Sequence, residues 1–576
     1  MTRSDFPASL SALVLLGACS AAPPAPPATV PAAWPFPAPA TVARAEHAMV
    51  ATDAPLATRV GVQVLQAGGN AVDAAIATAF ALAVVYPEAG NIGGGGFLVV
   101  RLADGTEAAL DFREKAPLAA TRDMYLDAEG NVTESSQVGH RASGVPGAVS
   151  GLWAAHARFG TRPWRELLAP AIQLAETGFT VDSAFARTVA GYADRLARFP
   201  ASAALLLPGG APIAAGSQWR NPELAAVLTR IAEHGPAGFY EGETADLIVA
   251  EMVRGGGLIT HEDLRGYDSE WREPVAFDYR GHRVLSMPPS SSGGITLALI
   301  ANILEGYPLG ELGWHSPRAL HLTAEAMRRA FADRNHYLGD PDFVPIPHAR
   351  LLSQGYADSL RAGIALDHAT RSTELRAGLG GDVESTHTTH FSVVDAHGNA
   401  VALTTTINDL FGSAVTVAGA GFLLNNEMDD FASKPGAPNL YGLVQGEANA
   451  IAGGKRMLSA MTPTIVLDPA GKPLLITGAR GGPRIISAVF QVLSNVIDHG
   501  MDIGAAVHAP RIHHQHFPDR IRYEPNGLGA ADSAALRALG HELQPGFVGT
   551  APSILRRDGF WTGAPDPRTG GLAAGY

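Results

Sequence analysis

The segment that follows residue 388 constrains the fold more than any other part of the chain. Thr389–Asp395 and Asn399–Ile407 are two runs of β-forming residues separated by a short turn that contains glycine. Thr462–Asp468 and Pro473–Thr477 repeat the arrangement farther on. Runs of this kind on either side of a turn predict β-hairpins. This part of the chain is therefore expected to supply paired strands to a sheet.

The first two-thirds of the chain has a mainly helical pattern with few strands. The predicted helices are 55–86, with a break at Gly68-Gly69-Asn70, then 147–178, 221–234, 314–336 and, later, 484–499. A further hairpin is predicted around Asp104-Gly105, between 97–101 and 107–112. Central strands with helices outside them predict a layered α/β or α+β body.

Composition excludes several classes of protein. The 576 residues are 46% apolar and 17% charged, which excludes bulk disorder. The formal net charge of −13 does not favour binding to nucleic acid. The longest uncharged apolar run after the leader, Ala74–Tyr86, has a length typical of a buried helix rather than a membrane span. A single cysteine excludes an intramolecular disulfide and a cysteine-rich metal site.

That cysteine lies in an informative place. Residues 1–18 combine a basic residue, an apolar stretch and small residues, as in a secretory signal peptide. Leu16-Gly17-Ala18-Cys19 resembles the bacterial lipobox, in which the cysteine is lipidated. Residues 19–42 are rich in proline and alanine and are expected to form an extended spacer. We expect a periplasmic protein held to the membrane by Cys19; the alternative is a chance cysteine in an ordinary signal peptide.

The first of the later hairpins brings two threonines together. A three-residue turn centred on His397 pairs residues whose numbers sum to 794, so Thr388 faces Thr406. Directly opposed side chains have Cβ atoms roughly 5 Å apart. A bulge at Gly398 would shift the pairing by one residue. The alternative is that both threonines are ordinary β-formers.

Other chemistries find weaker support. His387 and His390 are three residues apart and lie on opposite faces of a strand, which does not suit a shared metal. The histidines at 513, 514 and 516 lack a second cluster or a helical HExxH pattern. The glycines at 93–96 are not followed by Lys-Ser/Thr, so they do not form a phosphate-binding loop, and the GxSxG spacing of serine hydrolases is absent. No metal is expected.

Ten ordered segments together resemble the gamma-glutamyltransferase family, also called glutathione hydrolases, from about residue 45 to the C-terminus. They are GGNAVDAAIATAFALAVVYPEAGNIGGGGF (68–97), ALDFRE (109–114), ASGVPGAV (142–149), PPSSSGGI (288–295), ADRNHYLGDPDF (332–343), TTHFSVVD (388–395), LLNNEMDDF (423–431), KRMLSAMTPTIV (455–466), GGPRII (481–486) and DPRTGGLAAGY (566–576). The resemblance implies the fold of an N-terminal-nucleophile hydrolase, an α+β, four-layer αββα sandwich.

The same resemblance implies that the chain cuts itself between His387 and Thr388. The products would be a large subunit, 43–387 after its leader, and a small catalytic subunit, 388–576, which together form one intertwined body as a heterodimer. A threonine hydroxyl is a weak nucleophile without a neighbouring base. Cleavage would give Thr388 a free α-amine with a pKa of about 7.7–8.0, which can take the hydroxyl proton.

The family's remaining site residues carry over by position. Thr406 would bond the nucleophile, and the N–H groups of Gly481 and Gly482 would form the oxyanion hole. The implied substrate-binding residues are Arg113 and Ser459 for the glutamyl α-carboxylate, Asn408, Glu427 and Asp430 for the α-ammonium, and Tyr441 in a lid at 435–446. Ala460 departs from the second serine found in many relatives, which puts one hydrogen bond to the α-carboxylate in doubt.

The sequence therefore predicts a gamma-glutamyltransferase/glutathione hydrolase that works through a γ-glutamyl–Thr388 ester. Its expected partners are glutathione, water and an amino-acid or peptide acceptor, with no cofactor, no nucleic acid and no membrane contact beyond the lipid. Two alternatives stay open. One is a related acylase of the cephalosporin or glutaryl-amide type, which Ala460 favours slightly. The other is a surface-anchored binding protein that never matures.

Overall fold

Two seven-stranded sheets form the centre of the protein. The computed structural model describes residues 1–2, 29–36, 42–375 and 388–576. The first sheet has, in spatial order, β1 (Ala43–Ala45), β18 (Phe560–Ala564), β17 (Ser553–Arg557), β13 (Pro473–Thr477), β12 (Thr464–Leu467), β9 (His282–Ser286) and β8 (Val275–Tyr279). The second has β19 (Leu572–Gly575), β2 (Met49–Thr52), β10 (Thr389–Val394), β11 (Ala400–Thr406), β3 (Gly95–Arg101), β4 (Glu107–Phe112) and β7 (Glu270–Arg272).

Side chains of the second sheet alternate between two hydrophobic clusters. Phe97 and Val99 of β3 belong to the cluster that also contains Ile465 of the first sheet. Leu98 and Val100, the residues between and after them, belong to the cluster that contains the helices on the other side. Successive side chains of a strand point to opposite faces, so this sheet is covered on both faces. The strand consequently reads as an unbroken apolar run.

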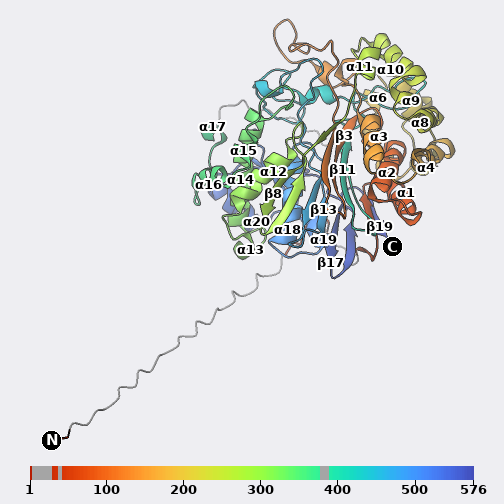
Figure 1. Ribbon diagram of the computed structural model, residues 1–576. Coiled ribbons are helices and arrows are strands. Elements are labelled where there is room, and N and C mark those ends of the chain that lie inside the picture. Colours follow the sequence, from red (N-terminus) through yellow and green to blue (C-terminus); the bar gives the residue numbers. More distant parts are fainter. Residues whose placement is uncertain (3–28, 37–41, 376–387) are drawn as a thin grey trace.

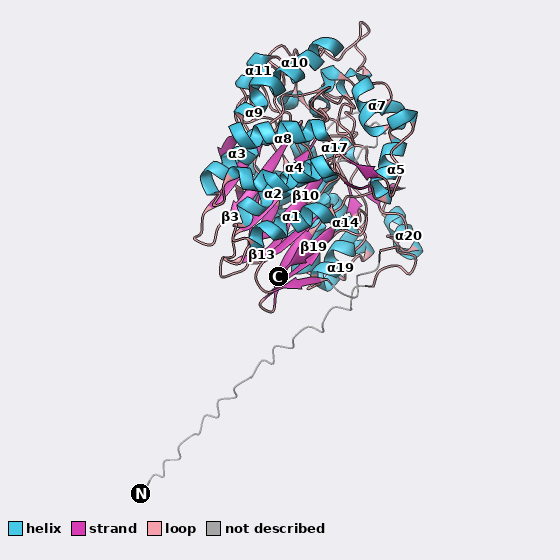
Figure 2. Cartoon of the chain, turned by 90° about the vertical axis from the view of Figure 1, so that its right-hand side faces the viewer, coloured by secondary structure: helices cyan, strands magenta, loops and turns pink. Residues whose placement is uncertain are grey.

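Helices cover the outer face of each sheet, as Figures 1 and 2 show. On the second sheet lie α1 (Pro55–Gln66) and α2 (Ala71–Val85), with α3 (Ala148–Phe159) and α4 (Trp164–Thr177) beside them. On the first lie α12 (Gly293–Leu304) and α18 (Arg484–Ile497), with α14 (Pro317–Tyr337) packed on α12. The order helix–sheet–sheet–helix confirms the predicted αββα sandwich.

Helix α2 explains why the longest apolar run after the leader does not span a membrane. All of its residues are buried between the second sheet and α4. Asn70 caps it by accepting from Asp73 N–H, while the Asp73 carboxylate accepts from Asn70 N–H. This capping box separates α2 from α1 at the predicted break. No helix among the described residues has the length and apolar character to cross a bilayer.

The other predicted helices are present with small changes. Segment 147–178 divides into α3 and α4. The helices predicted at 221–234, 314–336 and 484–499 are present as α8 (Pro222–His234), α14 and α18, and each begins and ends within three residues of its predicted range. The predicted hairpins are present as β3–β4, β10–β11 and β12–β13. The strand expected from Thr462 begins at Thr464, and a register shift lies between Val466 and Leu467.

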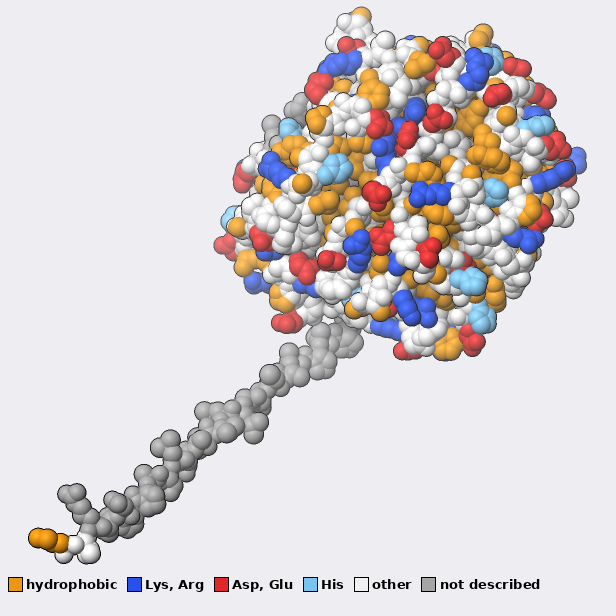
Figure 3. Space-filling view, in the orientation of Figure 1, with side chains coloured by type: hydrophobic (Ala, Val, Ile, Leu, Met, Phe, Trp, Pro, Cys, Tyr) orange, Lys and Arg blue, Asp and Glu red, His pale blue; other side chains and the backbone are white. Residues whose placement is uncertain are grey.

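Each sheet contains strands from both sides of residue 388. In the second sheet, β10 and β11 lie between β2 and β3, although β2 and β3 precede residue 388. His387 lies outside the described residues, so the scission and the subunit boundaries 43–387 and 388–576 stay predictions. So do the leader assignments, because Cys19 and most of 1–42 are also outside them. On the face shown in Figure 3, acidic and basic side chains are interspersed.

Candidate active site

The β10–β11 hairpin places Thr388 beside Thr406. Thr389 pairs with Thr405, and the pairing continues to Val394 and Ala400 without a shift. The residue numbers sum to 794, as expected for a regular hairpin without a bulge. The two threonines thus lie at the open end of the hairpin, where both are buried and both line one cavity.

This cavity has an empty volume of about 300 Å³. It gathers side chains that are far apart in sequence. Its lining is Arg113, Arg334, Thr388, Thr406, Asn408, Glu427, Asp430, Tyr441, Leu443, Ser459, Ala460, Met461, Gly482, Pro483 and Ile485. Every described residue that the family resemblance assigns to the site is therefore here, except Gly481, which directly precedes Gly482.

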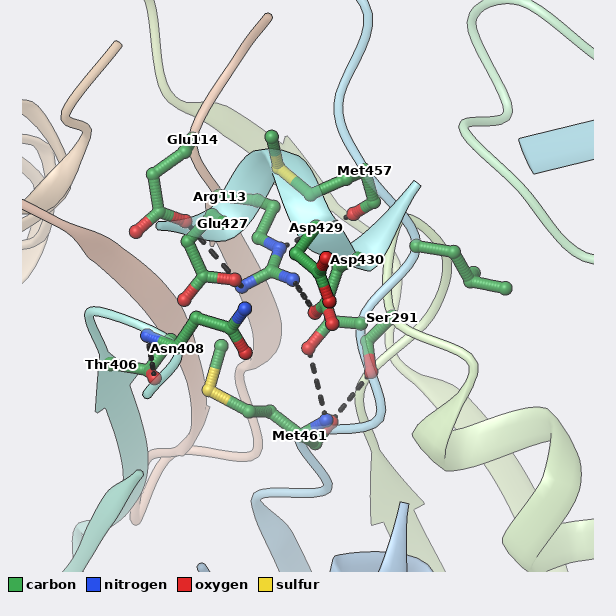
Figure 4. A network of polar contacts seen from close by, with 12 residues as sticks. Arg113, Glu114, Ser291, Thr406, Asn408, Glu427, Asp429, Asp430, Met457 and Met461 are labelled. Atoms are coloured by element: carbon green, nitrogen blue, oxygen red, sulfur yellow. Dashed lines mark hydrogen bonds and ion pairs between the residues drawn. The ribbon is translucent and has the colours of Figure 1, made fainter. Parts of the chain in front are cut away.

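A buried guanidinium is held between carboxylates on one side of the cavity (Figure 4). Arg113 follows β4, and its Nη1 lies 2.6 Å from Glu427 Oε2, while its Nη2 pairs with Asp430. Its Nε donates to the Met457 carbonyl at 3.2 Å. Burial lowers the pKa of Arg113, but the two carboxylates outweigh this effect and hold the pKa above its ordinary value. Arg113 therefore remains charged in the buried site.

The carboxylates respond to the same burial in the opposite direction. Burial raises the pKa of Glu427 and of Asp430, and the Arg113 guanidinium opposes that rise. Glu114, next to Arg113 in the chain, has its pKa raised to about 7, again mainly by burial. The cavity therefore holds both signs of charge, each dependent on the other for compensation.

Asn408 is held at the turn after β11. Its backbone is in the left-handed region with φ 74°, and its N–H donates to Thr406 Oγ1 at 2.8 Å. Its side-chain amide donates to the Asn426 carbonyl at 3.0 Å, while its side-chain oxygen accepts from the Tyr441 hydroxyl. This contact fastens the segment predicted to be a lid across the cavity.

Gly481 and Gly482 lie in the turn between β13 and α18, with φ angles of 137° and 59°. A Cβ on Gly482 would come 2.6 Å from the Tyr441 ring, so the close approach requires glycine. Arg484 Nε donates to the Gly481 carbonyl at 3.1 Å and helps to fix this turn. Within the described ranges, neither glycine N–H has an acceptor. Both donors are therefore available to a ligand.

Ser459 and Ala460 line the cavity, and their segment is held to residues 290–292 by backbone hydrogen bonds. Ser459 N–H donates to the Ser290 carbonyl at 3.0 Å, and Ser292 N–H donates to the Ser459 carbonyl at 2.8 Å. Ser459 Oγ accepts from the Met461 N–H at 3.1 Å. Ala460 lines the cavity with a methyl group where a serine would present a hydroxyl.

The sequence reasoning did not assign a role to Arg334. This residue lies on α14 and lines the cavity, where Asp430 acts on its charge. Its Nε donates to Ser292 Oγ at 3.1 Å, and its Nη1 donates to Gln445 Oε1 at 3.0 Å. Burial lowers its pKa to about 10. Its place in the family-like segment 332–343 could have pointed to a functional role. Its contact with Gln445 could not be predicted, because the two residues are far apart in the sequence.

The histidines considered as metal ligands make other contacts. His390 bonds Thr404 and Ser392, and His513 bonds Ser487 and Gln515. His387 lies outside the described residues. The structure instead brings together three possible metal ligands that the sequence did not suggest, and each of them already has a protein partner. They are His321 and His541, whose ring nitrogens are 2.8 Å apart, and Glu325, which pairs with Arg328 and Arg329.

Comparisons with known proteins agree with this geometry. The family model of gamma-glutamyltranspeptidase matches residues 57–576. A glutathione hydrolase proenzyme of Pseudomonas sp. (strain A14) is 48% identical, over 92% of this chain and 95% of its own length. One of Escherichia coli (strain K12) is 45% identical over 98% of both. The crystal structure of cephalosporin acylase from Bacillus halodurans has a TM-score of 0.82 at 30% identity, covering 95% and 99% of the two chains.

Proposed function

The chain belongs to the gamma-glutamyltranspeptidase family, and we propose that Thr388 is the nucleophile through which it acts. The protein is an autoprocessing gamma-glutamyltransferase/glutathione hydrolase. The arrangement of Thr388 and Thr406 at the cavity supports the proposed role of Thr388.

In the proposed reaction, scission of the His387–Thr388 bond first frees the α-amine of Thr388. The amine takes the proton of the Thr388 hydroxyl as its oxygen attacks the γ-carbonyl of the substrate. The N–H groups of Gly481 and Gly482 stabilise the negative oxygen of the tetrahedral intermediate, a contribution typically worth ~10²–10³ in rate per donor. The departing amine accepts the proton, which leaves a γ-glutamyl ester on Thr388.

The second half repeats these steps with a new nucleophile. Water, or the amine of an amino acid or peptide, attacks the ester carbonyl and gives its proton to the Thr388 α-amine. Collapse of the intermediate breaks the ester bond and returns that proton to the Thr388 oxygen. The products are free glutamate with water and a new γ-glutamyl amide with an amine acceptor. Thr406, whose Oγ1 accepts from Asn408 N–H, is proposed to orient the nucleophile.

The ion pairs of Arg113 with Glu427 and Asp430 are the observation that carries the substrate assignment. A γ-glutamyl group presents an α-carboxylate and an α-ammonium on one carbon. We propose that its carboxylate takes the guanidinium of Arg113 while its ammonium takes the two carboxylates. Each buried charge then exchanges one partner for another, which avoids an uncompensated charge. Asn408 and Ser459 are proposed to add hydrogen bonds, and Tyr441 to cover the bound group.

A second candidate function is hydrolysis of other acyl amides, as in the acylase with the similar structure. Ala460 favours it, because the methyl group offers no hydrogen bond to an α-carboxylate. The carboxylates of Glu427 and Asp430 argue against this second function. An acyl group without an ammonium brings no positive charge to pair with them, so they would have only Arg113 as a partner. We therefore rank the γ-glutamyl group first.

A set of three anilides tests the assignment. Processed protein is incubated with γ-glutamyl, glutaryl and 4-aminobutyryl p-nitroanilide; the second lacks the ammonium and the third lacks the carboxylate. We expect kcat/KM to be highest for the γ-glutamyl compound by at least about tenfold, since a charge-assisted hydrogen bond contributes ~1.5–3 kcal/mol. Equal or faster turnover of the glutaryl compound would favour the acylase function instead.

We also propose that residues 1–18 are a signal peptide and that Cys19 carries a lipid that holds the protein in the periplasm. The support is the sequence of the leader and its proline-rich continuation. The large and small subunits are proposed to stay associated because strands of both pair with each other within each sheet. Intact masses of the purified chains test the leader, the lipid and the cut, with a small subunit that begins at Thr388 and a large subunit whose preceding 19–42 spacer begins at an acylated Cys19. A large subunit with an unmodified N-terminus would reject the anchor.

A further inference from the structure

A second cleft lies beside the helical layer on the second sheet. Among the described residues, it shares no lining residue with the catalytic cavity. It is formed by α1, the end of α2, α4, β5 (Phe179–Thr180) and α5 (Ser183–Gly191). Its empty volume is about 1200 Å³ including its open mouth, which is ample for a small-molecule ligand. We refer to it as the α1–α5 cleft.

The walls of the α1–α5 cleft are mostly apolar, with Thr180, Asp182 and Gln218 as polar exceptions. Their apolar part is formed by Pro55, Leu56, Val85, Leu174, Phe179 and Phe185. Phe179 and Phe185 pack edge-on against the Trp219 ring, at centroid distances of 5.5 and 5.9 Å, so their positions are fixed. Leu56 and Ala184 are exposed at the cleft. The cleft therefore offers a solvent-accessible entrance to an ordered apolar surface.

The inner part of the cleft is polar. Asp53, Tyr86 and Glu88 line it, and an adjoining recess lined by Tyr86 and Glu88 also contains Arg480. Glu88 is only 3% exposed, yet its Oε2 has no hydrogen-bond partner among the described residues. Arg480 Nη1 donates to the Tyr86 hydroxyl, while its Nε has no partner in the same described part of the chain. A buried acceptor without a donor indicates an unfilled position.

Glu88 has no ion-pair partner among the described residues at this inner end. Asp53 accepts from Thr389 Oγ1 at 3.2 Å and from Thr569 Oγ1 at 2.9 Å, whereas Glu88 Oε2 accepts from neither. Asp182 also lines the cleft, and Arg187 and Arg568 line the adjoining recess together with Arg480. Arg568 is paired with Glu524 and Asp566, and the charges that act on Glu88 are those of Arg480, Asp182 and Asp53. Burial raises the pKa of Glu88 to about 8, although the Arg480 charge opposes the rise. A positive charge beside Glu88 would compensate its carboxylate when that group is ionised.

We propose that the α1–α5 cleft binds an amphiphilic amine, meaning a protonated amine attached to an apolar body about the size of one aromatic ring. The ammonium donates to the Glu88 carboxylate at the inner end, and the apolar body packs against Leu56, Phe179 and Phe185. This site is separate from the catalytic cavity, but residues at its inner end lie next to residues that position the catalytic groups. Asp53 bonds Thr389, the neighbour of Thr388, and Arg480 directly precedes Gly481.

Titration calorimetry of the processed, two-chain protein tests the proposal. The probes are 2-phenylethylamine and 3-phenylpropanoate, which share an apolar body and carry opposite charges. Saturating L-glutamate occupies the catalytic cavity, and pH 8.5 keeps Glu88 largely ionised. We expect one saturable site for the amine and at least tenfold weaker binding of the carboxylate. Carboxylate binding as tight as amine binding, or no saturable binding of either probe, would overturn the proposal.

Two variants locate the site. Glu88→Gln keeps the shape of the side chain and removes its charge, so we expect amine affinity to fall at least tenfold. Glu176→Gln on the exposed face of α4 removes the same charge outside the cleft and should leave affinity unchanged. Ala184→Phe, at the exposed mouth, should obstruct entry without altering the buried carboxyl. Unchanged amine affinity in either Glu88→Gln or Ala184→Phe would refute the assignment, and should Glu88→Gln fail to mature, Ala184→Phe decides.

Discussion

A buried arginine lies near carboxyl groups both in the catalytic cavity and in the recess that adjoins the α1–α5 cleft, but the two places differ in how these charges are paired. In the cavity, Arg113 contacts both Glu427 and Asp430 directly. In that recess, Arg480 bonds the Tyr86 hydroxyl, and Glu88 forms no ion pair among the described residues. The cavity is also smaller than the α1–α5 cleft, with about 300 Å³ of empty volume against about 1200 Å³.

This difference indicates two kinds of recognition. A ligand of the cavity must replace both partners of an existing ion pair, so it must bring both charges in a fixed geometry. A ligand of the α1–α5 cleft needs to bring only one charge, because the unsatisfied position is already present. Because the charges of the cavity are paired with one another, the cavity favours a zwitterionic ligand. Because Glu88 is not ion-paired and lies beside apolar walls, the cleft favours a singly charged, amphiphilic molecule.

Thr388→Ala should have the largest effect, and it acts on the cavity alone. Without the hydroxyl, neither self-cleavage nor ester formation can occur, and loss of a covalent nucleophile can lower kcat on the order of 10⁶-fold. We expect a single full-length polypeptide on a denaturing gel and no release of p-nitroaniline. Thr388→Ser, which keeps a hydroxyl, is the matched control and should retain some cleavage. Normal turnover by uncut Thr388→Ala would show that the nucleophile lies elsewhere.

Arg113→Ala should come next, because it breaks the compensation within the cavity. It removes the proposed anchor of the α-carboxylate and leaves Glu427 and Asp430 as buried carboxylates without their guanidinium. Breaking a buried pair typically costs ~3–5 kcal/mol of stability, and we expect kcat/KM for the γ-glutamyl anilide to fall at least about 10²-fold. Arg113→Lys preserves the charge but not the forked geometry, and should lose less.

The 4-aminobutyryl anilide separates binding from folding in these variants. It has no carboxylate, so its low kcat/KM should change much less than that of the γ-glutamyl substrate when Arg113 becomes Lys. An equal fractional loss for both anilides would mean that Arg113 supports the structure of the cavity and does not contact the carboxylate.

The features of the catalytic cavity that depend on local structure or on shared motifs could be predicted from the sequence. The hairpin register that places Thr388 beside Thr406 could be predicted from the short turn, because the turn fixes which residues of the two strands face each other. The short strands β1, β17, β18 and β19 were not predicted, since three to five residues carry too little periodicity. Arg334 and the α1–α5 cleft were missed because they arise from contacts between segments far apart in the chain.

Ala460→Ser should sharpen the comparison by strengthening recognition in the cavity. The new hydroxyl would line the cavity beside Ser459, where a hydrogen bond to a carboxylate is worth ~1.5–3 kcal/mol. We expect KM for both the γ-glutamyl and the glutaryl anilide to fall by about tenfold. The 4-aminobutyryl anilide serves as the control and should not respond. A KM that stays constant for all three would place the carboxylate away from position 460.

Glu88→Gln should have the smallest effect, on stability, and it tests whether the cleft contains an uncompensated carboxyl. Folded Glu88 keeps its proton up to a pKa of about 8, above its ordinary value of 4.5, mainly because of burial. Between these values the unfolded chain has lost the proton and the folded one has not, so stability falls as pH rises. The contribution is fully present below pH 4.5 and is lost as pH rises through 8.

Glutamine does not titrate, so the melting temperature of Glu88→Gln should exceed that of the parent protein by more at pH 8.5 than at pH 5, by on the order of a few °C. Tryptophan fluorescence of the processed protein can follow this difference, with Glu176→Gln as the variant that should show no such trend. The contrast between the two sites depends on this result. A constant difference across pH would mean that Glu88 ionises as in water, and the cleft would then be compensated as fully as the catalytic cavity.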